Sequence, residues 1–251
     1  MLVTIMVQMM IDIHTHIIFN IDDGCKSLED SLKTIVNLRN LGFKKVVLTP
    51  HYMQGTKYIA NNKLKIYKFN ILKDEVKKHN IDIELYLGNE IYINYNIENL
   101  IVNNEIYSIN NSRYLLIELP LYNEINGVMD YLYELKLKGF VPIIAHPERY
   151  SYFQKDYKKM DELYDSGILF QSNYGSIIGL YGNDAKKLIK YALKEDMISF
   201  MSTDTHNPNF SLINNFDKVV KKIKKIVGEE RFKDITYNNA LRVIENKTIE
   251  N

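Results

Sequence analysis

Short apolar runs alternate with longer amphipathic stretches along most of the sequence. The runs are rich in Ile, Val and Leu, and they predict seven strands, at residues 10–13, 45–48, 81–87, 114–117, 140–145, 168–171 and 198–201. The stretches between them place apolar residues at helical spacing and predict helices between Ser27 and Gly42 and over residues 62–78, 127–138, 157–166, 184–194 and 212–227. This alternation of strands and helices indicates a parallel sheet covered by helices.

Capping residues support several of these helix boundaries. Ser27 is followed three residues later by Asp30, which is the pattern of an N-terminal capping box. Gly42, Gly139 and Gly167 stand where helices are expected to end, because glycine readily takes the left-handed conformation found there. The C-terminal residues 231–251 also have a helical pattern.

The number of strand–helix units sets the expected architecture. Seven units within about 240 residues fit a barrel close in size to the (β/α)8 barrel, and an open doubly wound sheet is the alternative. The sequence contains no linker rich in Gly, Ser or Pro and no internal repeat. We therefore expect a single domain over residues 1–251, with a core at about 10–216 and a C-terminal helical segment at about 217–251.

Composition excludes some functions and favours a cytoplasmic protein. Of the 251 residues, 46% are apolar, which is enough for a substantial core, and the formal net charge of +1 predicts no nucleic-acid partner. One cysteine, Cys25, excludes an intramolecular disulfide and fits a reducing compartment. Residues 1–10 lack the Lys or Arg of a signal peptide, so we interpret them as a short extension, with Met9 or Met10 as an alternative start. No apolar stretch is long enough for membrane insertion.

Histidines and carboxylates gather at the C-terminal ends of the predicted strands. Nine side chains lie at these ends or in the loops just beyond them: His14, His16, Asp23, His51, Glu90, Glu118, His146, Asp204 and His206. In a parallel barrel these ends converge on one rim, where active sites form. The sixth histidine, His79, lies near the end of a predicted helix among lysines, and we expect it to be solvated.

These residue types predict a metal site. Imidazole together with carboxylate suits Zn, Mn or Fe, whereas oxygen ligands alone suit Mg or Ca. His14 and His16 are two residues apart on a strand, so their side chains point the same way and can bind one ion. Nine ligands exceed the need of one ion, and two or three clustered divalent ions suit phosphoryl chemistry. Arg149 lies close to His146, and its guanidinium can hold a phosphoryl group through two parallel hydrogen bonds.

Each feature also has an ordinary explanation when it is taken alone. A single His-x-His pair in a strand is usually incidental, and Asp22-Asp23-Gly24 is more often a turn. Arg149 can simply pair with Glu148, and Asp204 can be a helix cap. The joint occurrence of these features at strand ends favours the metal site, and hence a metal-dependent phosphate-ester hydrolase.

The motifs, in this order, resemble a known superfamily. They are Ile11-Asp12-Ile13-His14-Thr15-His16, Asp22-Asp23-Gly24, Thr49-Pro50-His51, Gly88-Asn89-Glu90, Leu116-Ile117-Glu118-Leu119-Pro120, Ala145-His146-Pro147-Glu148-Arg149-Tyr150 and Ser202-Thr203-Asp204-Thr205-His206-Asn207. Over residues 10–216 the chain resembles the polymerase-and-histidinol-phosphatase (PHP) superfamily. More narrowly, it is similar to the bacterial protein-tyrosine phosphatases associated with capsule synthesis.

The resemblance implies a distorted (β/α)7 barrel with three metal ions per chain. Manganese is the expected metal, with Fe, Zn and Mg as alternatives. The implied ligands are His14, His16, Glu90 and Asp204 for the first ion, Glu90, Glu118 and His146 for the second, and Asp23, His51 and His206 for the third. Arg149 would bind the phosphoryl group and act in catalysis together with Asp23, His51 and His206. A metal-bridging hydroxide would attack phosphorus, and a phenolate would leave.

The resemblance also implies a role. The substrate would be a phosphotyrosine protein, namely a bacterial tyrosine kinase of polysaccharide export, and the activity would regulate capsular or exopolysaccharide synthesis. The alternatives are a small-molecule phosphomonoesterase with a histidinol-phosphate-like substrate and a non-catalytic metal-binding regulatory protein. The oligomeric state stays open.

Two features bear on the substrate and on the chemical mechanism. Family members usually carry a second arginine shortly after the final histidine, but residues 207–212 contain none, which affects substrate preference. Thiol-dependent tyrosine phosphatases place an arginine six residues after the nucleophilic cysteine. Here Ser31 stands at that distance from Cys25, so the sequence predicts no thiol-based catalysis.

Overall fold

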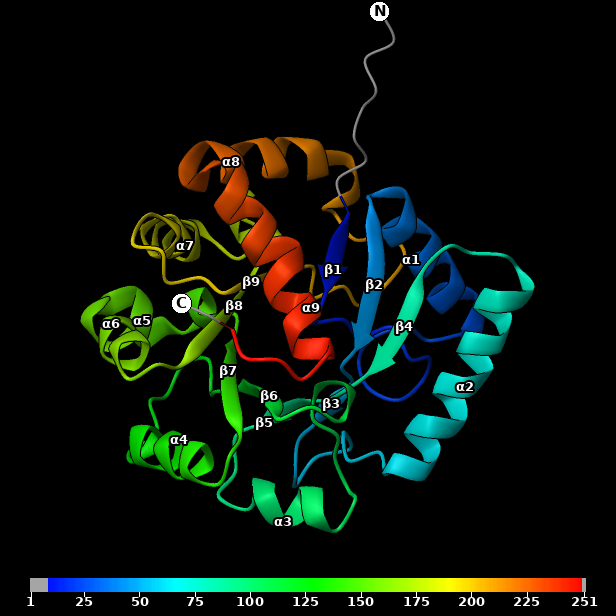
Figure 1. Cartoon of the computed structure of the whole chain (residues 1–251), viewed down its shortest axis with the longest axis horizontal. Coiled ribbons are helices and arrows are strands. Elements are labelled where there is room, and N and C mark those ends of the chain that lie inside the picture. Colours follow the sequence, from blue (N-terminus) through cyan, green and yellow to red (C-terminus); the bar gives the residue numbers. More distant parts are fainter. Residues whose placement is uncertain (1–8, 250–251) are drawn as a thin grey trace, which may run out of the picture.

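The chain forms an α/β fold of parallel strands and surrounding helices. A computed structural model describes residues 9–249. Its strands are β1 (Met10–Asp12), β2 (Phe43–Leu48), β3 (His51–Tyr52), β4 (Glu84–Leu87), β5 (Glu90–Tyr92), β6 (Tyr114–Glu118), β7 (Val141–Ala145), β8 (Leu169–Asn173) and β9 (Phe200–Ser202). Its α-helices are α1 (Leu28–Asn40), α2 (Asn62–Lys78), α3 (Ile97–Val102), α4 (Val128–Leu137), α5 (Ser151–Lys155), α6 (Lys158–Asp165), α7 (Asn183–Lys194), α8 (Phe216–Lys233) and α9 (Asn239–Ile244). Helices α1 to α8 surround the strands in Figure 1.

All paired strands within the described residues are parallel. They form a three-stranded sheet in the order β1-β2-β4 and a six-stranded sheet in the order β3-β5-β6-β7-β8-β9. Backbone hydrogen bonds link the regions between the sheets, from Gly88 N to the carbonyl of Leu48 (2.9 Å) and from Glu90 N to that of Thr49 (3.3 Å). The end of β1 also meets the end of β9, where Thr15 and Thr205 form a parallel bridge.

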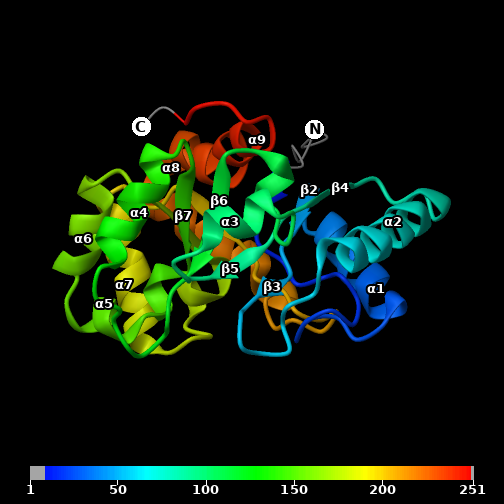
Figure 2. The ribbon, with the colours of Figure 1, turned by 90° about the horizontal axis from the view of Figure 1, so that it is seen from below.

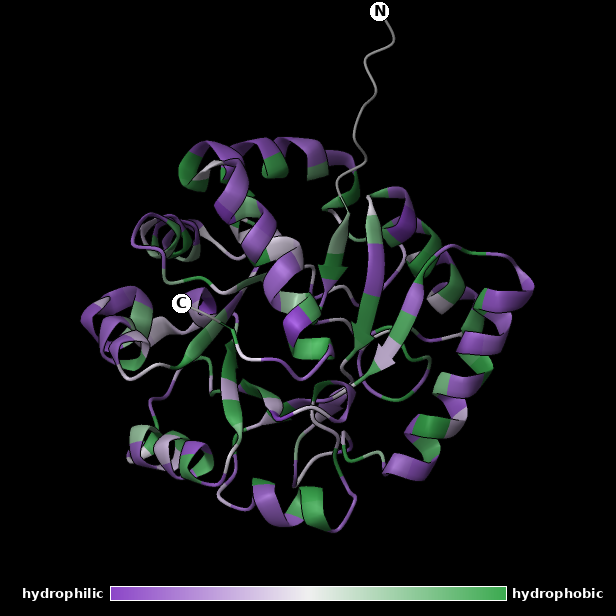
Figure 3. Cartoon of the chain, viewed as in Figure 1, coloured by the Kyte–Doolittle hydropathy of each residue, from purple (hydrophilic) through white to green (hydrophobic). Residues whose placement is uncertain are grey.

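Buried apolar side chains form two clusters, one on each face of the strands. The larger cluster packs strand residues against the outer helices, through side chains such as Ile35, Leu72 and Leu132. The smaller cluster combines strand residues such as Ile11 and Leu116 with apolar residues of α9. Figure 3 shows the corresponding mainly apolar strands within helices of mixed polarity.

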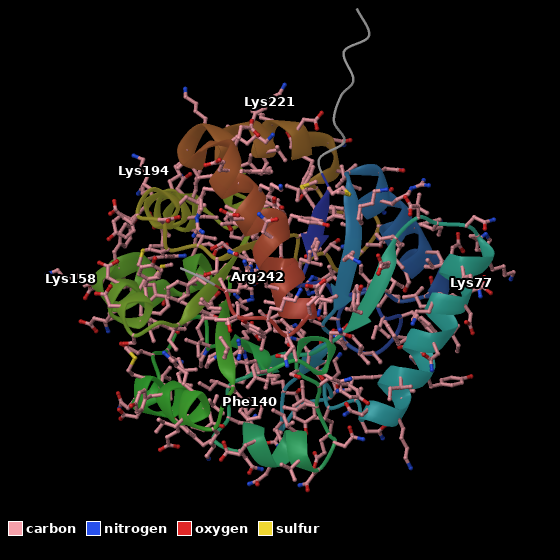
Figure 4. All side chains as sticks on the ribbon, viewed as in Figure 1. Lys77, Phe140, Lys158, Lys194, Lys221 and Arg242 are labelled. Carbon is pink, nitrogen blue, oxygen red and sulfur yellow. The ribbon has the colours of Figure 1, made fainter. Side chains whose placement is uncertain are left out.

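Helix α9 and the site loops lie at opposite ends of the strands. In Figure 2, α9 lies on the upper side, and the loops that follow β1 and β9 lie on the lower side. Lys77, Lys158, Lys194 and Lys221 lie at the outer periphery of the molecule in Figure 4. Within the described residues, none of the helices is sufficiently long and apolar to span a membrane.

The predicted elements are mostly present, with several differences. Ser27 caps α1 by accepting a hydrogen bond from Asp30 N (3.1 Å), and α2 has its predicted bounds. Strand 81–87 begins only at Glu84, because Ile81 N still bonds to the carbonyl of Val76 at the end of α2. Helix 212–227 begins at Phe216, and although α8 runs to Lys233, Gly228 is non-helical (φ 82°, ψ 171°) and interrupts it directly after the predicted end.

Other predictions were wrong or incomplete. The C-terminal helical pattern ends earlier than predicted within the described residues, because α9 ends at Ile244 and residues 245–249 form no helix. Strands β3 and β5 and helices α3 and α5 were missed, since each is too short to show a clear period. The expected extension at residues 1–10 lies outside the described residues except for its last two positions, and Met10 begins β1.

Candidate metal centre

The nine predicted ligand residues come together at the C-terminal ends of the strands. Their potential ligand atoms form overlapping groups, with all atoms of a group within 4.8 Å of one another: His16, Asp23, His51 and His206; His14, Glu90 and His146; His14, His16 and Asp204; and His51, Glu90 and Glu118. Glu118 ends β6, whereas His51 and Glu90 begin the short strands β3 and β5. The strand pairing is thus interrupted just before His51, between β2 and β3, and just before Glu90, between β4 and β5.

Six of the residues form a buried set, which we call the inner group: His14, His16, Glu90, Glu118, His146 and Asp204. His14 Nε2 lies 3.2 Å from His16 Nε2, 3.3 Å from Glu90 Oε2 and 3.5 Å from Asp204 Oδ1. His146 Nε2 lies 3.0 Å from Glu90 Oε1 and 3.8 Å from Glu118 Oε1. An ion with ligands at about 2.0–2.2 Å keeps neighbouring ligand atoms roughly 2.9–3.6 Å apart. Most of these spacings therefore fit shared ions.

The other three residues form the outer group, Asp23, His51 and His206. Asp23 Oδ1 lies 3.5 Å from His51 Nε2 and 3.6 Å from His206 Nε2. The side chains of Asp23, His206 and His51 are 45%, 30% and 12% exposed, respectively. The rings of His16 and His206 stack with their centroids 4.1 Å apart, so the inner and outer groups are contiguous.

Buried polar atoms at the centre test whether these residues fit metal ions. Glu118 Oε2 and His146 Nδ1 are buried and make no hydrogen bond within the described chain, while His51 Nδ1 and Glu90 Oε2 lie 2.9 Å apart as an ion pair without hydrogen-bond geometry. Buried atoms of this kind are normally paired, because leaving them unpaired costs about 1–3 kcal/mol each. Carboxylate oxygens and imidazole nitrogens are also suitable ligands for divalent ions. The residues therefore fit a metal site.

The charges of the inner group act strongly on one another. Burial disfavours the imidazolium of His14, but the charges of Glu90 and Asp204 outweigh burial and raise its pKa to about 9. Burial also opposes ionisation of Glu90, but His14 and His51 dominate and hold its pKa well below the usual value. Protons thus balance the carboxylates in the metal-free chain, and a bound cation would displace them.

Two other inner residues are held neutral by their surroundings. Burial, together with the charge of Glu90, raises the pKa of Glu118 to about 8. Burial and the nearby Arg149 lower the pKa of His146 to about 4. His146 is therefore already in the neutral form that metal binding requires.

Backbone geometry at the centre is unusual at three positions. His146 and Asp204 have φ angles of 32° and 52°, in the left-handed region that costs a non-glycine residue about 1–3 kcal/mol. Gly24 packs so closely that a Cβ atom there would lie 2.0 Å from the carbonyl oxygen of His16. The turn at Asp22-Asp23-Gly24 therefore requires glycine in order to lie against the first strand end.

Two residues that support the ligands were not recognised in the sequence. Asp22 accepts a hydrogen bond from His16 Nδ1 (2.8 Å) and another from His51 N (3.0 Å). Gln171 Oε1 lies 2.7 Å from His14 Nδ1. Such partners fix the ring orientation of ligating histidines. Asp22 within Asp-Asp-Gly and Gln171 at a strand end were the available sequence clues.

Arg149 lies at the edge of the inner group. Its Nη1 donates to Asp204 Oδ2 (3.0 Å), and its guanidinium lies 4.8 Å from the ring centre of Tyr181. The alternative pairing with Glu148 is wrong, because Glu148 accepts from Ser176 Oγ (2.6 Å) instead. With 24% of its side chain exposed, Arg149 can reach a ligand at the open side of the centre.

A buried lysine lies behind Glu90. Lys65 of α2 is fully buried and donates to Asn89 Oδ1 (2.7 Å) and to the carbonyl of Glu105 (3.2 Å). Asn89 in turn donates to the carbonyl of Pro50 (2.8 Å), next to His51. Lys65 thereby connects α2 to the two short segments between strands that precede His51 and Glu90.

Two further residues lie outside the metal centre. His79 caps the end of α2 and lies near Glu75 (3.4 Å), with 55% of its side chain exposed, as expected. Cys25 is buried beside Thr34, and burial raises the pKa of its thiol. A raised thiol pKa disfavours the nucleophilic thiolate.

Comparisons with known proteins agree on one family. A family model described as "Capsular polysaccharide synthesis, CpsB/CapC" matches residues 10–245. A putative tyrosine-protein phosphatase CapC from Staphylococcus aureus is 37% identical over 199 residues, covering 79% of this chain and 77% of that protein. Tyrosine-protein phosphatase YwqE from Bacillus subtilis is 28% identical over 243 residues, covering 96% and 93% of the two chains.

Solved structures support the fold. A structure of the metal-dependent tyrosine phosphatases YwqE from Bacillus subtilis and CpsB from Streptococcus pneumoniae matches with a TM-score of 0.88 and 28% identity, covering 96% of each chain. Histidinol phosphate phosphatase from Lactococcus lactis matches with a TM-score of 0.55 and 14% identity, covering 85% of this chain and 93% of that one. The second likeness shows the fold alone.

Proposed function

The chain belongs to the CpsB/CapC family of capsular polysaccharide synthesis, and we propose that it is a metal-dependent protein-tyrosine phosphatase. This agrees with the resemblance to capsule-associated phosphatases. The main support is the convergence of nine imidazole and carboxylate side chains in a chain whose relatives are named tyrosine phosphatases.

The proposed centre holds three divalent ions, with manganese favoured and Fe, Zn or Mg as alternatives. His14, His16, Glu90 and Asp204 hold the first ion, and Glu90, Glu118 and His146 hold the second. Asp23, His51 and His206 hold the third, with His16 also within reach. When bound, such ions supply positive charge to phosphoryl oxygens and lower the pKa of water toward neutrality.

The protein side chains contribute binding and orientation. Arg149 turns part of its guanidinium from Asp204 toward the phosphoryl group and binds it through parallel hydrogen bonds. Asp22 and Gln171 hold the rings of His16 and His14 in place. Asp23, His51 and His206 form the exposed side of the centre, from which the phenolate departs. A tyrosine leaving group has a pKa of about 10, which makes it a better leaving group than an alkoxide.

The finer architecture follows the same proposal. The two sheets are parts of one distorted (β/α)7 barrel of the PHP type, in which β3 continues β2 and β5 continues β4. Supporting this view, hydrogen bonds link the two sheets near Gly88 and Glu90, and Thr15 bridges to Thr205 between the first and last strands. The whole chain is then one metallohydrolase domain.

The proposed substrate is a phosphotyrosine protein of capsule or exopolysaccharide synthesis, namely a bacterial tyrosine kinase of polysaccharide export. Support for this class comes from the names of the relatives and the family description. A cytoplasmic location suits such a substrate. The small formal charge of +1 gives no reason to expect a nucleic-acid partner.

Chelation is the direct test of the proposed chemistry. We expect the Mn²⁺-loaded protein to hydrolyse a phosphotyrosyl peptide and p-nitrophenyl phosphate, and to lose this activity on exhaustive chelation. Activity that survives chelation would sink the mechanism. A large kcat/KM advantage for histidinol phosphate over the phosphotyrosyl peptide would instead favour a small-molecule phosphatase.

A substitution at Arg149 separates substrate binding from metal binding. We expect Arg149→Met to raise KM by about 10- to 100-fold, since it removes charged hydrogen bonding to the phosphoryl group worth about 1.5–3 kcal/mol in total. The metal content of the variant, measured by elemental analysis, should stay at the wild-type value. Loss of ions together with activity would place Arg149 among the groups that maintain the metal centre.

A further inference from the structure

A cavity of about 320 Å³ opens beside the metal centre, between the segments that follow β8 and β9. Asp204 and His206 of the centre line it, together with Leu180, Tyr181 and Phe210. Pockets for small ligands usually span roughly 300–1,000 Å³. This one is at the lower end of that range, so it suits one compact group rather than an extended ligand.

The loop after β8 presents two apolar side chains to this cavity. Gly179 and Gly182 have φ angles of +86° and +95°, and they flank Leu180 and Tyr181 in a tight turn. Leu180 and Tyr181 are 46% and 36% exposed, although they lie beside a highly polar centre. Adjacent exposed apolar side chains in a concave site are a common mark of ligand contact.

Tyr181 lies between Gly175 and Arg149. A Cβ atom at Gly175 would lie 2.8 Å from Leu180 Cδ1 and 3.4 Å from Tyr181 Cε2, so the absence of a side chain at Gly175 lets the turn pack closely. The centre of the Tyr181 ring lies 4.8 Å from the guanidinium carbon of Arg149. The ring thus lies next to the residue that we assign to phosphoryl binding.

The polar part of the lining has little charge to offer a ligand. Asn207, Asn209 and Ser211 contribute uncharged groups. Among the described lining residues, Asp204 is the one carboxylate, and it already accepts hydrogen bonds from Arg149 (3.0 Å) and Asn173 (2.8 Å). A substrate amine would find one carboxylate that already accepts two hydrogen bonds, whereas an uncharged aromatic ring could contact Leu180, Tyr181 and Phe210.

We propose that this cavity, the aryl pocket, receives the phenyl ring of phosphotyrosine while the phosphoryl group lies at the metal centre and Arg149. The assignment rests on the proposed phosphatase function and specifies how that site selects aryl esters. Tyr181 and Phe210 contact the ring. Aromatic contacts of this kind prefer ring centroids about 4.5–7 Å apart, a separation that a compact pocket can provide.

Two inert phosphonates test the pocket without catalysis. Calorimetry on the Mn²⁺-loaded protein should show phenylphosphonate binding about tenfold more tightly than methylphosphonate, from burial and aromatic contact of the ring. Tyr181→Ala should remove most of this preference while leaving methylphosphonate affinity unchanged. Tyr181→Phe keeps the ring and should keep the preference.

A second aromatic residue provides a matched comparison. Tyr58 stacks on His51 at a ring distance of 5.8 Å and does not line the pocket. Tyr58→Ala should retain the phenyl preference. If Tyr58→Ala abolishes that preference and Tyr181→Ala keeps it, the ring binds elsewhere and the assignment is overturned.

Kinetics separate this inference from the proposed function. Tyr181→Ala should raise KM for phosphotyrosine about fivefold, from loss of an aromatic contact, with kcat and the KM for O-phosphoserine unchanged. Equal losses on both esters would mean that Tyr181 acts only through Arg149, which overturns the pocket alone. Activity that survives chelation would overturn the proposed function, while the phosphonate pair would still decide the pocket.

Discussion

The inner and outer ligand groups differ in how firmly the fold holds them. The inner residues are buried, come from several strand ends and are braced by Gln171 and Asp22. The outer group depends on Asp23, from a loop, with His51 and His206, and it is partly open to solvent. Buried ligands exclude water and bind an ion more rigidly than exposed ones. The inner group therefore defines the centre, and the outer group provides access to it.

Substitution of Glu90, the proposed ligand shared by the inner ions, should have the largest effect on metal content and activity. Glu90 contacts His14, His16, His51 and His146, so Glu90→Gln removes a negative charge at the meeting point of the proposed ions. We expect loss of more than one ion per chain and a fall in kcat/KM of at least about 10³-fold, because metal ions supply several kcal/mol to the transition state. Elemental analysis and steady-state kinetics measure both.

Glu105 provides a control for the loss of a carboxylate in the same region. It accepts a hydrogen bond from Tyr52 (2.9 Å) and is no candidate ligand. Glu105→Gln should keep both the metal content and the activity. A Glu90→Gln variant with its full complement of ions would contradict the division into two groups.

A substitution in the outer group should remove its ion without affecting the ions of the inner group. Asp23→Asn removes its one carboxylate, so we expect the loss of a single ion and a fall in kcat/KM of about 10²-fold, with the inner ions retained. Stepwise chelation followed by elemental analysis should also release the outer ion of the wild-type protein first. Simultaneous release of all ions would show that exposure does not separate the groups.

The sequence predicted nine candidate ligands that the structure brings together, and the resemblance predicted three ligand sets, but the division by burial into inner and outer groups was not predicted. Each ligand lies at the end of an apolar run or in a loop just beyond it, and these runs are long enough to show strand character. Strands β3 and β5 have two and three residues, too few to show the alternation of buried and exposed side chains. The interruptions of the strands before His51 and Glu90 were therefore not predicted. The grouping depends on strand register and on the burial of each side chain, neither of which a single sequence specifies.

The supporting residues were harder to predict for a related reason. Gln171 is separated from His14 by 157 positions, and only the packed strands bring them within 2.7 Å. Asp22 looked like part of an ordinary turn, because its two partners come from different strand ends. Residues that act through a ligand thus leave a weaker sequence pattern than the ligands themselves.

A supporting residue that serves both groups should have an intermediate effect. Asp22 accepts hydrogen bonds from the ring of His16 and from the backbone of His51. Burial alone would raise the pKa of the Asp22 carboxyl, but the charge and hydrogen bond of His16 outweigh burial and lower it. We expect Asp22→Asn to weaken metal affinity by about 10- to 100-fold, as for other partners of ligating histidines. Titration of the metal-free protein with Mn²⁺ measures this change. Asp30→Asn, in the first turn of α1, is a control that should leave the affinity unchanged.

The smallest effect on activity is expected behind the inner group, at Lys65. Burial lowers the pKa of Lys65 from 10.5 to about 7, so between these values the unfolded chain binds one more proton than the folded chain. The free energy of unfolding therefore rises with pH across this window, and the cost of the buried charge is fully present below pH 7. Lys65→Met removes this dependence, at a cost to activity of less than about tenfold because no ligand is lost.

Urea unfolding of the metal-free protein between pH 6 and pH 10 measures the effect. Relative to Lys65→Met, the wild-type protein should gain more than about 1 kcal/mol of stability as the pH rises above 7. Lys63→Met, which alters an exposed lysine of the same helix, should leave the pH dependence unchanged. If Lys65→Met retains the wild-type slope, the lysine is charged at no cost in the folded chain. Its hydrogen bonds to Asn89 and Glu105 would then fully offset burial, and the support behind Glu90 would be an ordinary charged contact.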